Sequence, residues 1–346
     1  ENGKHVGIEV PAAPTVEDAW ALVETAERTR RHCMMLENGC YNHRRISAFN
    51  LCRTGLIGDV YYGEAYYAHD LRGLFYPGLD QERKGWYSEH WRIEWFRHHH
   101  GNTYPTHGLG PLAQIMDIGR GDQFDYLVSM ETPAFGQQAY GEWKYGKAEM
   151  AKRAPVINGD TNTTLIRTKN GKTIYLVHDV TSPRRLGFIQ GTKGALDVDP
   201  DFKVAFETVP NRKIDESLPV YDQVPESEVW HSEINGTPVL QKYLHPYVAA
   251  AELLALKVSS RNGVGGHNVV DALMDLRIVH CLRKGLPLDQ NVYDLAAWSS
   301  VCELSERSVV NRSQAIDFPD FTRGAWKTLP RFDISAADIA AMDLKV

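Results

Sequence analysis

Gly3-Lys4-His5-Val6-Gly7-Ile8-Glu9-Val10-Pro11 is the stretch of this 346-residue sequence that decides its fold. The apolar run over residues 4–9 predicts a short strand, which ends in a carboxylate and a turn proline. We expect Thr15 to cap a helix with Asp18 three residues later, followed by a buried strand over residues 33–36 and a helix over about 44–54. Strand, helix, strand and helix over residues 1–58 predict the C-terminal half of a Rossmann-type doubly wound parallel sheet.

The pattern changes at residue 59. Residues 60–68 alternate in a way that predicts a long strand, and Asn170-Gly171 predicts the turn of a hairpin. Residues 71–103 predict an aromatic, loop-rich stretch. Further strands are expected near 125–131, 161–168, 173–181, 187–190, 195–198 and 203–209, and helices over about 106–121, 246–260, 267–284 and 293–310. The sequence therefore predicts an α/β chain of two domains, 1–58 and 59–346, the second being α+β with helices on one side of a mixed or antiparallel sheet.

Composition and charge argue against several classes of partner. The formal net charge is -6 and no basic run stands out, which argues against a nucleic-acid partner. No apolar run approaches the ~20 residues that are needed to cross a membrane. The five cysteines are widely spaced and predict neither a disulfide framework nor a zinc site. Adjacent residues such as His98, His99 and His100 do not share a face of a helix or strand, so we expect no metal site there.

The segment Tyr104-Pro105-Thr106-His107-Gly108-Leu109-Gly110-Pro111 contains the first candidate catalytic residue. Thr106 is a natural N-cap, which places His107 in the first turn of the predicted helix. The helix dipole disfavours a charged imidazole there, and a neutral histidine is a usable base towards a hydroxyl group. A structural histidine bonded to the backbone is the alternative.

Residues 108–113 also match the G-x-G-x-x-A pattern of dinucleotide-binding loops. This pattern has meaning only after a strand and within a βαβ unit, and residues 98–103 do not predict a buried strand. We therefore expect the two glycines to serve the N-terminus of a helix.

Three more candidates lie at the ends of predicted strands. Glu9 follows the first strand, where sheets of this kind bind ligands, and its carboxylate either bonds a ribose or nicotinamide edge or caps a turn. Tyr41 lies beyond the next strand and is expected to face the same crevice, where a lowered pKa would make it an acid or base. A core tyrosine is the alternative. Arg72 follows the long strand and either clamps a polar ligand or forms a surface salt bridge.

Several segments together resemble a known family. They are residues 3–11, 32–38, 69–72, 91–92, 101–102, 104–111, 178–179 and 181–184. In this order they resemble the Gfo/Idh/MocA oxidoreductase superfamily. Within it the chain is most similar to glycoside hydrolase family 109, the NAD-dependent α-N-acetylgalactosaminidases. Segments 33–38 and 104–111 are specific to that branch.

The resemblance implies roles for individual residues. Residues 1–58 would be a truncated dinucleotide-binding domain, and residues 59–346 a substrate-binding domain with C-terminal helices. Tyr41 and His107 occupy catalytic positions, and Arg72 and Tyr104 occupy positions that contact the carbohydrate. The positions that meet the nicotinamide end of the implied cofactor, NAD, are Glu9, Val10, Asn38, Trp91 and Arg92. No metal is implied.

The reaction implied by the resemblance is hydrolysis of a terminal α-N-acetylgalactosamine by oxidation, elimination, addition and reduction. NAD takes a hydride from C3, Tyr41 removes the C2 proton, the group on C1 leaves, water adds and the hydride returns. His107 handles the C3 hydroxyl. Such a reaction needs no pair of catalytic carboxylates, unlike that of ordinary glycosidases.

The sequence departs from the family in three places. Val10 stands where the superfamily has a lysine, and the hydrolase branch also lacks it, so Val10 favours a hydrolase over a sugar dehydrogenase of the same superfamily. Leu186 stands where family members carry a tyrosine near the sugar. We expect the family's first strand, glycine loop and ribose-binding acid to precede Glu1, which would make this chain part of a longer protein.

Two further expectations come from the resemblance. No signal segment is visible, but the family implies a periplasmic or secreted protein. The superfamily also implies a homo-oligomer that forms through the sheet of the second domain. Besides the sugar dehydrogenase, a non-catalytic sugar-binding relative is the other alternative.

Overall fold

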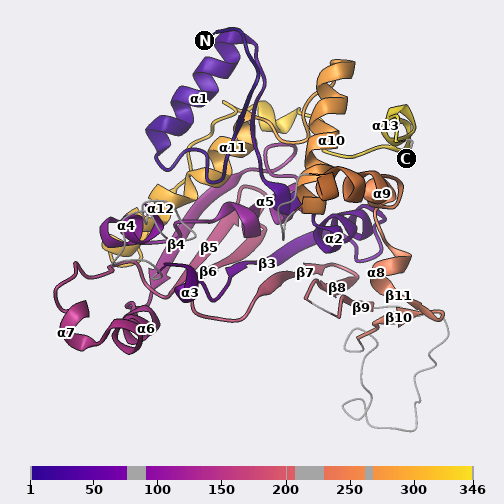
Figure 1. The fold of residues 1–346 in the computed structure, drawn as a ribbon. Helices are drawn as coiled ribbons and strands as arrows, with labels where there is room; N and C mark the ends of the chain where they lie inside the picture. Colours follow the sequence, from indigo (N-terminus) through magenta and orange to yellow (C-terminus); the bar gives the residue numbers. More distant parts are fainter. Residues whose placement is uncertain (1, 76–90, 200, 207–229, 262–267, 345–346) are drawn as a thin grey trace.

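A computed structural model describes residues 2–75, 91–199, 201–206, 230–261 and 268–344. Its N-terminal part is a βαβ unit (Figure 1). Strands β1 (Val6–Ile8) and β2 (Cys33–Met35) pair in parallel, and helix α1 (Val16–Thr29) connects them. The Thr15 hydroxyl accepts a hydrogen bond from the Asp18 amide at 3.0 Å, which confirms the predicted cap. The 3₁₀ turn η1 (Asn38–Tyr41) and helix α2 (His43–Arg53) follow, so the predicted order of elements is correct.

A mixed sheet of eight strands forms the main layer of the rest of the chain. Strand β3 (Val60–Ala68) lies inside it, parallel to β6 (Thr173–Asp179) and antiparallel to β7 (Arg185–Gly191). Strands β5 and β6 form the predicted hairpin, and Gly171 in its turn has a φ of 87°. The sheet order is β12 (Ile316–Asp317), β4 (Phe124–Glu131), β5 (Thr161–Thr168), β6 (Thr173–Asp179), β3, β7 (Arg185–Gly191), β8 (Gly194–Asp197) and β9 (Lys203–Phe206).

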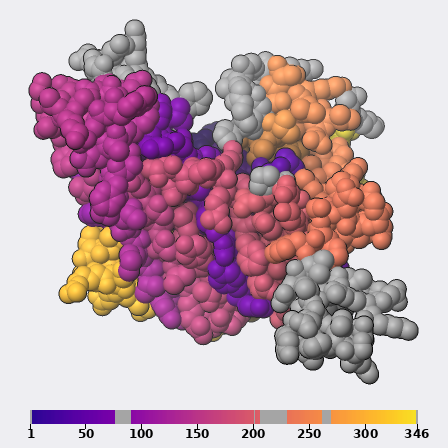
Figure 2. All heavy atoms as spheres, turned by 90° about the horizontal axis from the view of Figure 1, so that it is seen from below, coloured from indigo at the N-terminus to yellow at the C-terminus, as the bar shows by residue number. Residues whose placement is uncertain are grey.

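Helices cover one face of this sheet, and the other face is open to view (Figures 1 and 2). Seen from below in Figure 2, β3 runs as a dark violet band at the surface between its neighbours. The helices on or beside the covered face include α5 (Thr106–Ile115), α9 (Pro246–Arg261), α10 (Asn268–Lys284), α11 (Val292–Ser299) and α12 (Val301–Val310). Among the helices of the described residues, none is long and apolar enough to cross a membrane.

Shorter elements complete the described part of the chain. At one end of the sheet they are α3 (Arg72–Phe75), α4 (Trp91–His98), α6 (Phe135–Tyr145) and α7 (Lys147–Met150). Elsewhere they are the hairpin of β10 (Glu233–Ile234) and β11 (Thr237–Pro238), α8 (Val239–Lys242), η5 (Ala325–Lys327) and α13 (Ala336–Ala341).

The structure corrects three predictions about the elements. Helix α5 ends at residue 115 and not at 121, because Asp117 takes a left-handed φ of 61° that a helix cannot continue through. The helix predicted over 293–310 is divided at Ser300 into α11 and α12. The stretch predicted as loop-rich contains α3 and α4. Strand β9 is described only to residue 206, and residues 76–90 and 207–209 lie outside the described residues.

Candidate active site

His107 is held by a carboxylate from the end of the N-terminal strand pair. Its Nδ1 lies 2.7 Å from Oε1 of Glu37, which lies two residues after the end of β2 and is fully buried. Burial by itself would raise the pKa of Glu37. The charge and hydrogen bond of His107, with help from Arg45, outweigh this effect and lower the pKa. Glu37 is therefore an ionised acceptor, and a proton on Nδ1 leaves Nε2 as the basic nitrogen of His107.

The capping prediction for Thr106 is wrong, but the placement of His107 is right. Pro105 occupies the N-cap position, and Thr106 is the first helical residue. Proline has no side-chain oxygen with which to cap the helix. His107 still lies in the first turn.

The glycines of the 104–111 segment lie in the N-terminal half of α5, as predicted, and they also allow it to pack closely on its neighbours. A Cβ on Gly108 would lie 3.0 Å from backbone atoms of Tyr66, and one on Gly110 would lie 2.9 Å from the ring of Trp298. Across the same contact, Leu112 occupies the space that a Cβ on Gly63 would need. Helix α5 therefore approaches β3 closely, which brings His107 to the carboxyl end of that strand.

Tyr67, near the end of β3, is the centre of an aromatic cluster around His107. Its ring stacks on His178 with centroids 5.6 Å apart and planes inclined by 7°. The ring centroids of Tyr104, His107 and His69 lie 4.7, 5.7 and 4.8 Å from that of Tyr67. Sequence reasoning assigned no role to Tyr67 or Glu37. Two features of the sequence could have indicated a role for these residues. Tyr67 lies two residues before His69 at a strand end, and Glu37 lies next to Asn38.

Arg92 lies against the same cluster. It is 3% exposed, and its guanidinium carbon lies 4.3 Å from the ring centroid of Tyr104 and 5.3 Å from that of Tyr67. Its neighbour Trp91 is 48% exposed. Of these two predicted cofactor residues, Arg92 is buried against the aromatic cluster and Trp91 lies at the surface beside Arg92.

The other predicted cofactor residues lie at one edge of the strand pair. Because β1 and β2 are parallel neighbours, their carboxyl ends coincide, and Glu9, Val10 and Asn38 follow those ends. Glu9 is exposed, whereas Val10 and Asn38 are partly buried. The Asn38 amide donates to Oδ1 of Asp271 at 2.6 Å.

Arg72 forms the surface salt bridge that was the alternative to ligand binding. Its Nε and Nη2 donate to the two oxygens of Asp70 at 2.9 and 2.7 Å, and its guanidinium lies 5.8 Å from the ring of Tyr140. The hydrogen bond from Arg72 lowers the pKa of Asp70. A substrate role for Arg72 stays a prediction.

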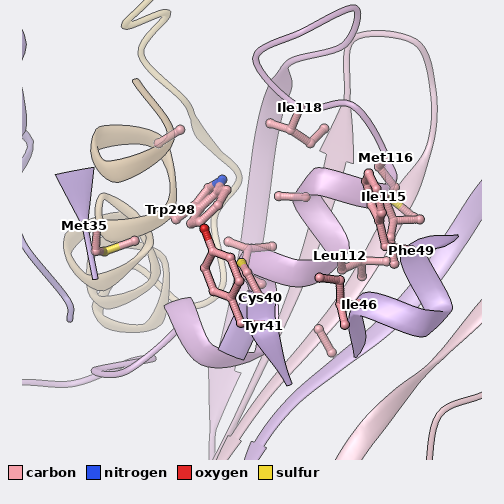
Figure 3. Close-up of a cluster of buried hydrophobic side chains, with 14 of the residues drawn as sticks. Met35, Cys40, Tyr41, Ile46, Phe49, Leu112, Ile115, Met116, Ile118 and Trp298 are labelled. Atoms are coloured by element: carbon pink, nitrogen blue, oxygen red, sulfur yellow. The ribbon is translucent and has the colours of Figure 1, made fainter. Parts of the chain in front are cut away.

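Tyr41 does not face the crevice, contrary to the expectation for a catalytic base. Figure 3 shows its ring inside the hydrophobic core, beside Cys40 and Trp298. It is 2% exposed, and its hydroxyl donates to Oδ2 of Asp289 at 2.7 Å. Burial, and then the charge of Asp289, raise the pKa of Tyr41 well above its usual value. The alternative of a core tyrosine describes this side chain.

Two of the three adjacent histidines, His99 and His100, are bound into the fold through carboxylates. His98 ends α4, His99 Nδ1 lies 3.0 Å from Glu306, and His100 pairs with Glu131. Within the described residues, no group of three His, Cys, Asp or Glu side chains is placed to hold a metal ion.

The comparison with known families decides where this arrangement belongs. Residues 41–328 match the model of the glycosyl hydrolase 109 C-terminal domain. The chain belongs to glycosyl hydrolase family 109. It is 42% identical over 330 residues to an α-N-acetylgalactosaminidase of Bacteroides fragilis, covering 94% of this chain and 72% of that one. A family 109 protein of Shewanella woodyi is 44% identical over 332 residues, covering 95% of this chain and 66% of that one.

Solved structures share the fold of this family 109 chain. A levoglucosan dehydrogenase in complex with NADH and levoglucosan superimposes with a TM-score of 0.57 at 16% identity, over 92% of this chain and 74% of that one. An inositol dehydrogenase homolog from Azotobacter vinelandii, in complex with NAD+, gives a TM-score of 0.55 at 15% identity, over 91% and 72%. The fold is thus part of a Rossmann-type sheet followed by an α+β domain, as predicted.

The buried His178 of the family 109 site predicts a dependence of stability on pH. His178 is fully buried, its ring nitrogens have no hydrogen-bond partner among the described residues, and burial lowers its pKa to about 3. The unfolded chain would take up this proton near pH 6.5, so stability falls as the pH drops from about 6.5 towards 3. At pH 5 this residue alone accounts for roughly 2 kcal/mol of lost stability.

We expect His178→Phe to weaken that dependence. Thermal unfolding at pH 7.5 and pH 5 measures it, and the fall in Tm between the two should be smaller in the variant than in the wild type. An equal fall in both proteins would show that His178 is not the group responsible.

Proposed function

We propose that this chain is the sugar-processing part of an NAD-dependent glycosidase that releases terminal α-N-acetylgalactosamine. The observation that carries the proposal is the His107–Glu37 pair beside the Tyr67 and Tyr104 rings, at the edge where the two N-terminal strands end. Aromatic faces provide flat apolar surfaces for a sugar ring, and the histidine provides a base. Membership of family 109 supports the same substrate class.

The strand edge suits the nicotinamide end of NAD. Glu9 offers a carboxylate to ribose hydroxyls, Val10 an apolar contact to the ring and Asn38 an amide to the carboxamide, with Trp91 and Arg92 on the sugar side. When bound, NAD would accept a hydride from the sugar and return it, so that the net reaction is hydrolysis.

His107 performs the proton transfer at the sugar hydroxyl in this proposal. Its Nδ1 is engaged with Glu37, so Nε2 takes the proton and later returns it. Tyr67 replaces Tyr41 as the second acid–base group, because its ring borders both His107 and Tyr104. Tyr104 and Arg72 contact the sugar.

The products distinguish this proposal from a sugar dehydrogenase. A full-length protein that contains this chain is incubated with NAD and para-nitrophenyl α-N-acetylgalactosaminide. The glycosidase releases nitrophenol and free sugar in equal amounts without accumulating NADH. NADH that accumulates in proportion to consumed sugar would support the dehydrogenase, and sugar binding without turnover would support a non-catalytic relative.

We also propose that copies of the chain associate through the uncovered face of the sheet. Met130 and Leu165 on the adjacent strands β4 and β5 are 65% and 43% exposed, and Tyr126 beside them is 36% exposed. Contiguous exposed apolar residues are typical of protein interfaces. Light scattering should find more than one copy per particle in the wild type and a single copy after Leu165→Glu. A monomeric wild type would contradict this proposal.

A further inference from the structure

We infer that Glu37, Gly39 and Arg45 form a positioning bracket that fixes His107 from two sides. Glu37 orients the imidazole of His107, and Arg45 fixes its backbone. Gly39 has no side chain, which leaves the space that Glu37 and Arg45 need to reach His107. What the bracket does for turnover rests on the proposed function, whereas its geometry does not.

Glu37 is itself immobilised before it contacts His107. Its Oε1 accepts from the Gly39 amide at 2.9 Å as well as pairing with His107 Nδ1 at 2.7 Å. Its backbone carbonyl accepts from Nε2 of Gln290 at 3.0 Å. The carboxylate is fully buried, and the Thr106 hydroxyl next to His107 also lowers its pKa, although less than His107 does. A buried carboxylate of this kind is stabilised mainly by the imidazole that it orients.

Arg45 fixes the main chain of the same histidine. Its Nη1 donates to the backbone oxygen of His107, and its Nη2 lies 3.5 Å from the backbone oxygen of Tyr66 on β3. Arg45 comes from α2, so it connects the first turn of α5 to the sheet. The attraction between Arg45 and Glu37 also contributes to the lowered pKa of Glu37.

Gly39 is required by space and not by backbone conformation. A Cβ at this position would lie 2.6 Å from Oε1 of Glu37 and 2.8 Å from Nη1 of Arg45. Gly110 on α5 has the same function from the other side, because a Cβ there would lie 3.0 Å from Cγ of Glu37. A side chain at Gly39 would push on the carboxylate oxygen that contacts His107, and one at Gly110 would press on the Trp298 ring and on Glu37 Cγ.

The chemical consequence concerns the tautomer of His107. A carboxylate only accepts hydrogen bonds, so it requires a proton on Nδ1 and leaves the lone pair on Nε2, where a base must have it. The carboxylate also stabilises the imidazolium cation that forms when Nε2 takes a proton. Glutamine at position 37 offers both a donor and an acceptor, so it neither enforces this tautomer nor stabilises the charge.

The test is Glu37→Gln in the full-length protein, assayed with para-nitrophenyl α-N-acetylgalactosaminide and NAD. We expect kcat to fall roughly 10- to 100-fold, as for other carboxylates that orient a functional imidazole, with KM changed much less. The matched control is Glu306→Gln, which alters the carboxylate beside His99 and should leave both quantities near wild type. An unchanged kcat in Glu37→Gln would overturn the inference.

Two further measurements test the positioning of His107 independently of turnover and of the folding of the Glu37→Gln variant. Long-range ¹H–¹⁵N spectra, with the His107 signals identified by their loss in His107→Ala, should show the Nδ1-protonated tautomer in the wild type and a mixture in Glu37→Gln. This result stands even if the wild type hydrolyses nothing, in which case the proposed function fails alone. If Glu37→Gln does not fold, Gly39→Ala tests the same bracket, and a wild-type tautomer there would overturn it.

Discussion

His107→Ala is expected to reduce hydrolysis of an α-N-acetylgalactosaminide by roughly 10²- to 10⁴-fold while NAD stays bound, since that is the range by which general bases contribute. The substitution removes the imidazole and keeps the backbone oxygen that Arg45 contacts, so α5 remains in place. The proposed cofactor residues Glu9, Val10 and Asn38 are unchanged. The measurements are kcat with the nitrophenyl substrate and the NAD released when the purified full-length variant is denatured.

The matched control for this prediction is His99→Ala. His99 is also a partly exposed histidine paired with a glutamate, Glu306, but it lies in the loop after α4, where its ring stacks on Trp95. Its activity should stay near wild type. Substantial turnover in His107→Ala would refute the role of His107.

Asp289→Ala is expected to cost about 3 to 5 kcal/mol of stability, because it leaves a buried charge without its partner. Asp289 accepts from Nε and Nη2 of Arg277 at 3.0 and 2.7 Å and from the Tyr41 hydroxyl at 2.7 Å. All three residues are less than 5% exposed. The free energy of unfolding from urea titration measures the effect.

Two comparison variants allow the result for Asp289→Ala to be interpreted. Asp125→Ala breaks the exposed pair with Lys169 and should cost less than about 1 kcal/mol. Tyr41→Phe removes only one hydrogen bond to Asp289 and should keep turnover within a few-fold of wild type, because the phenol lies in the core. Equal losses of stability in Asp289→Ala and Asp125→Ala would contradict the account of this buried network. Loss of turnover in a stable Tyr41→Phe would restore the original role of Tyr41.

The sequence predicts well what depends on neighbouring residues. The cap by Thr15, the alternation of β3 and the turn at Gly171 are local patterns, and each element is present in the structure. The break at Ser300 was missed because neither glycine nor proline marks it.

The site was predicted less completely, because its geometry depends on distant contacts. Glu37 and His107 are 70 residues apart, and Tyr67 joins them only because α5 packs closely on β3. Tyr41 follows the same strand as Glu37, but the turn η1 directs its side chain into the core, where Asp289 binds it. Position at a strand end alone does not show which way a side chain points.

The most direct test of the central claim is hydrolysis in deuterium oxide. The full-length protein with NAD acts on the nitrophenyl substrate, and NMR of the released N-acetylgalactosamine measures deuterium at C2. Oxidation and elimination require the C2 proton to leave, so we predict that the released sugar carries deuterium there. Released sugar that retains its original C2 proton, or no released sugar at all, would contradict the proposed reaction.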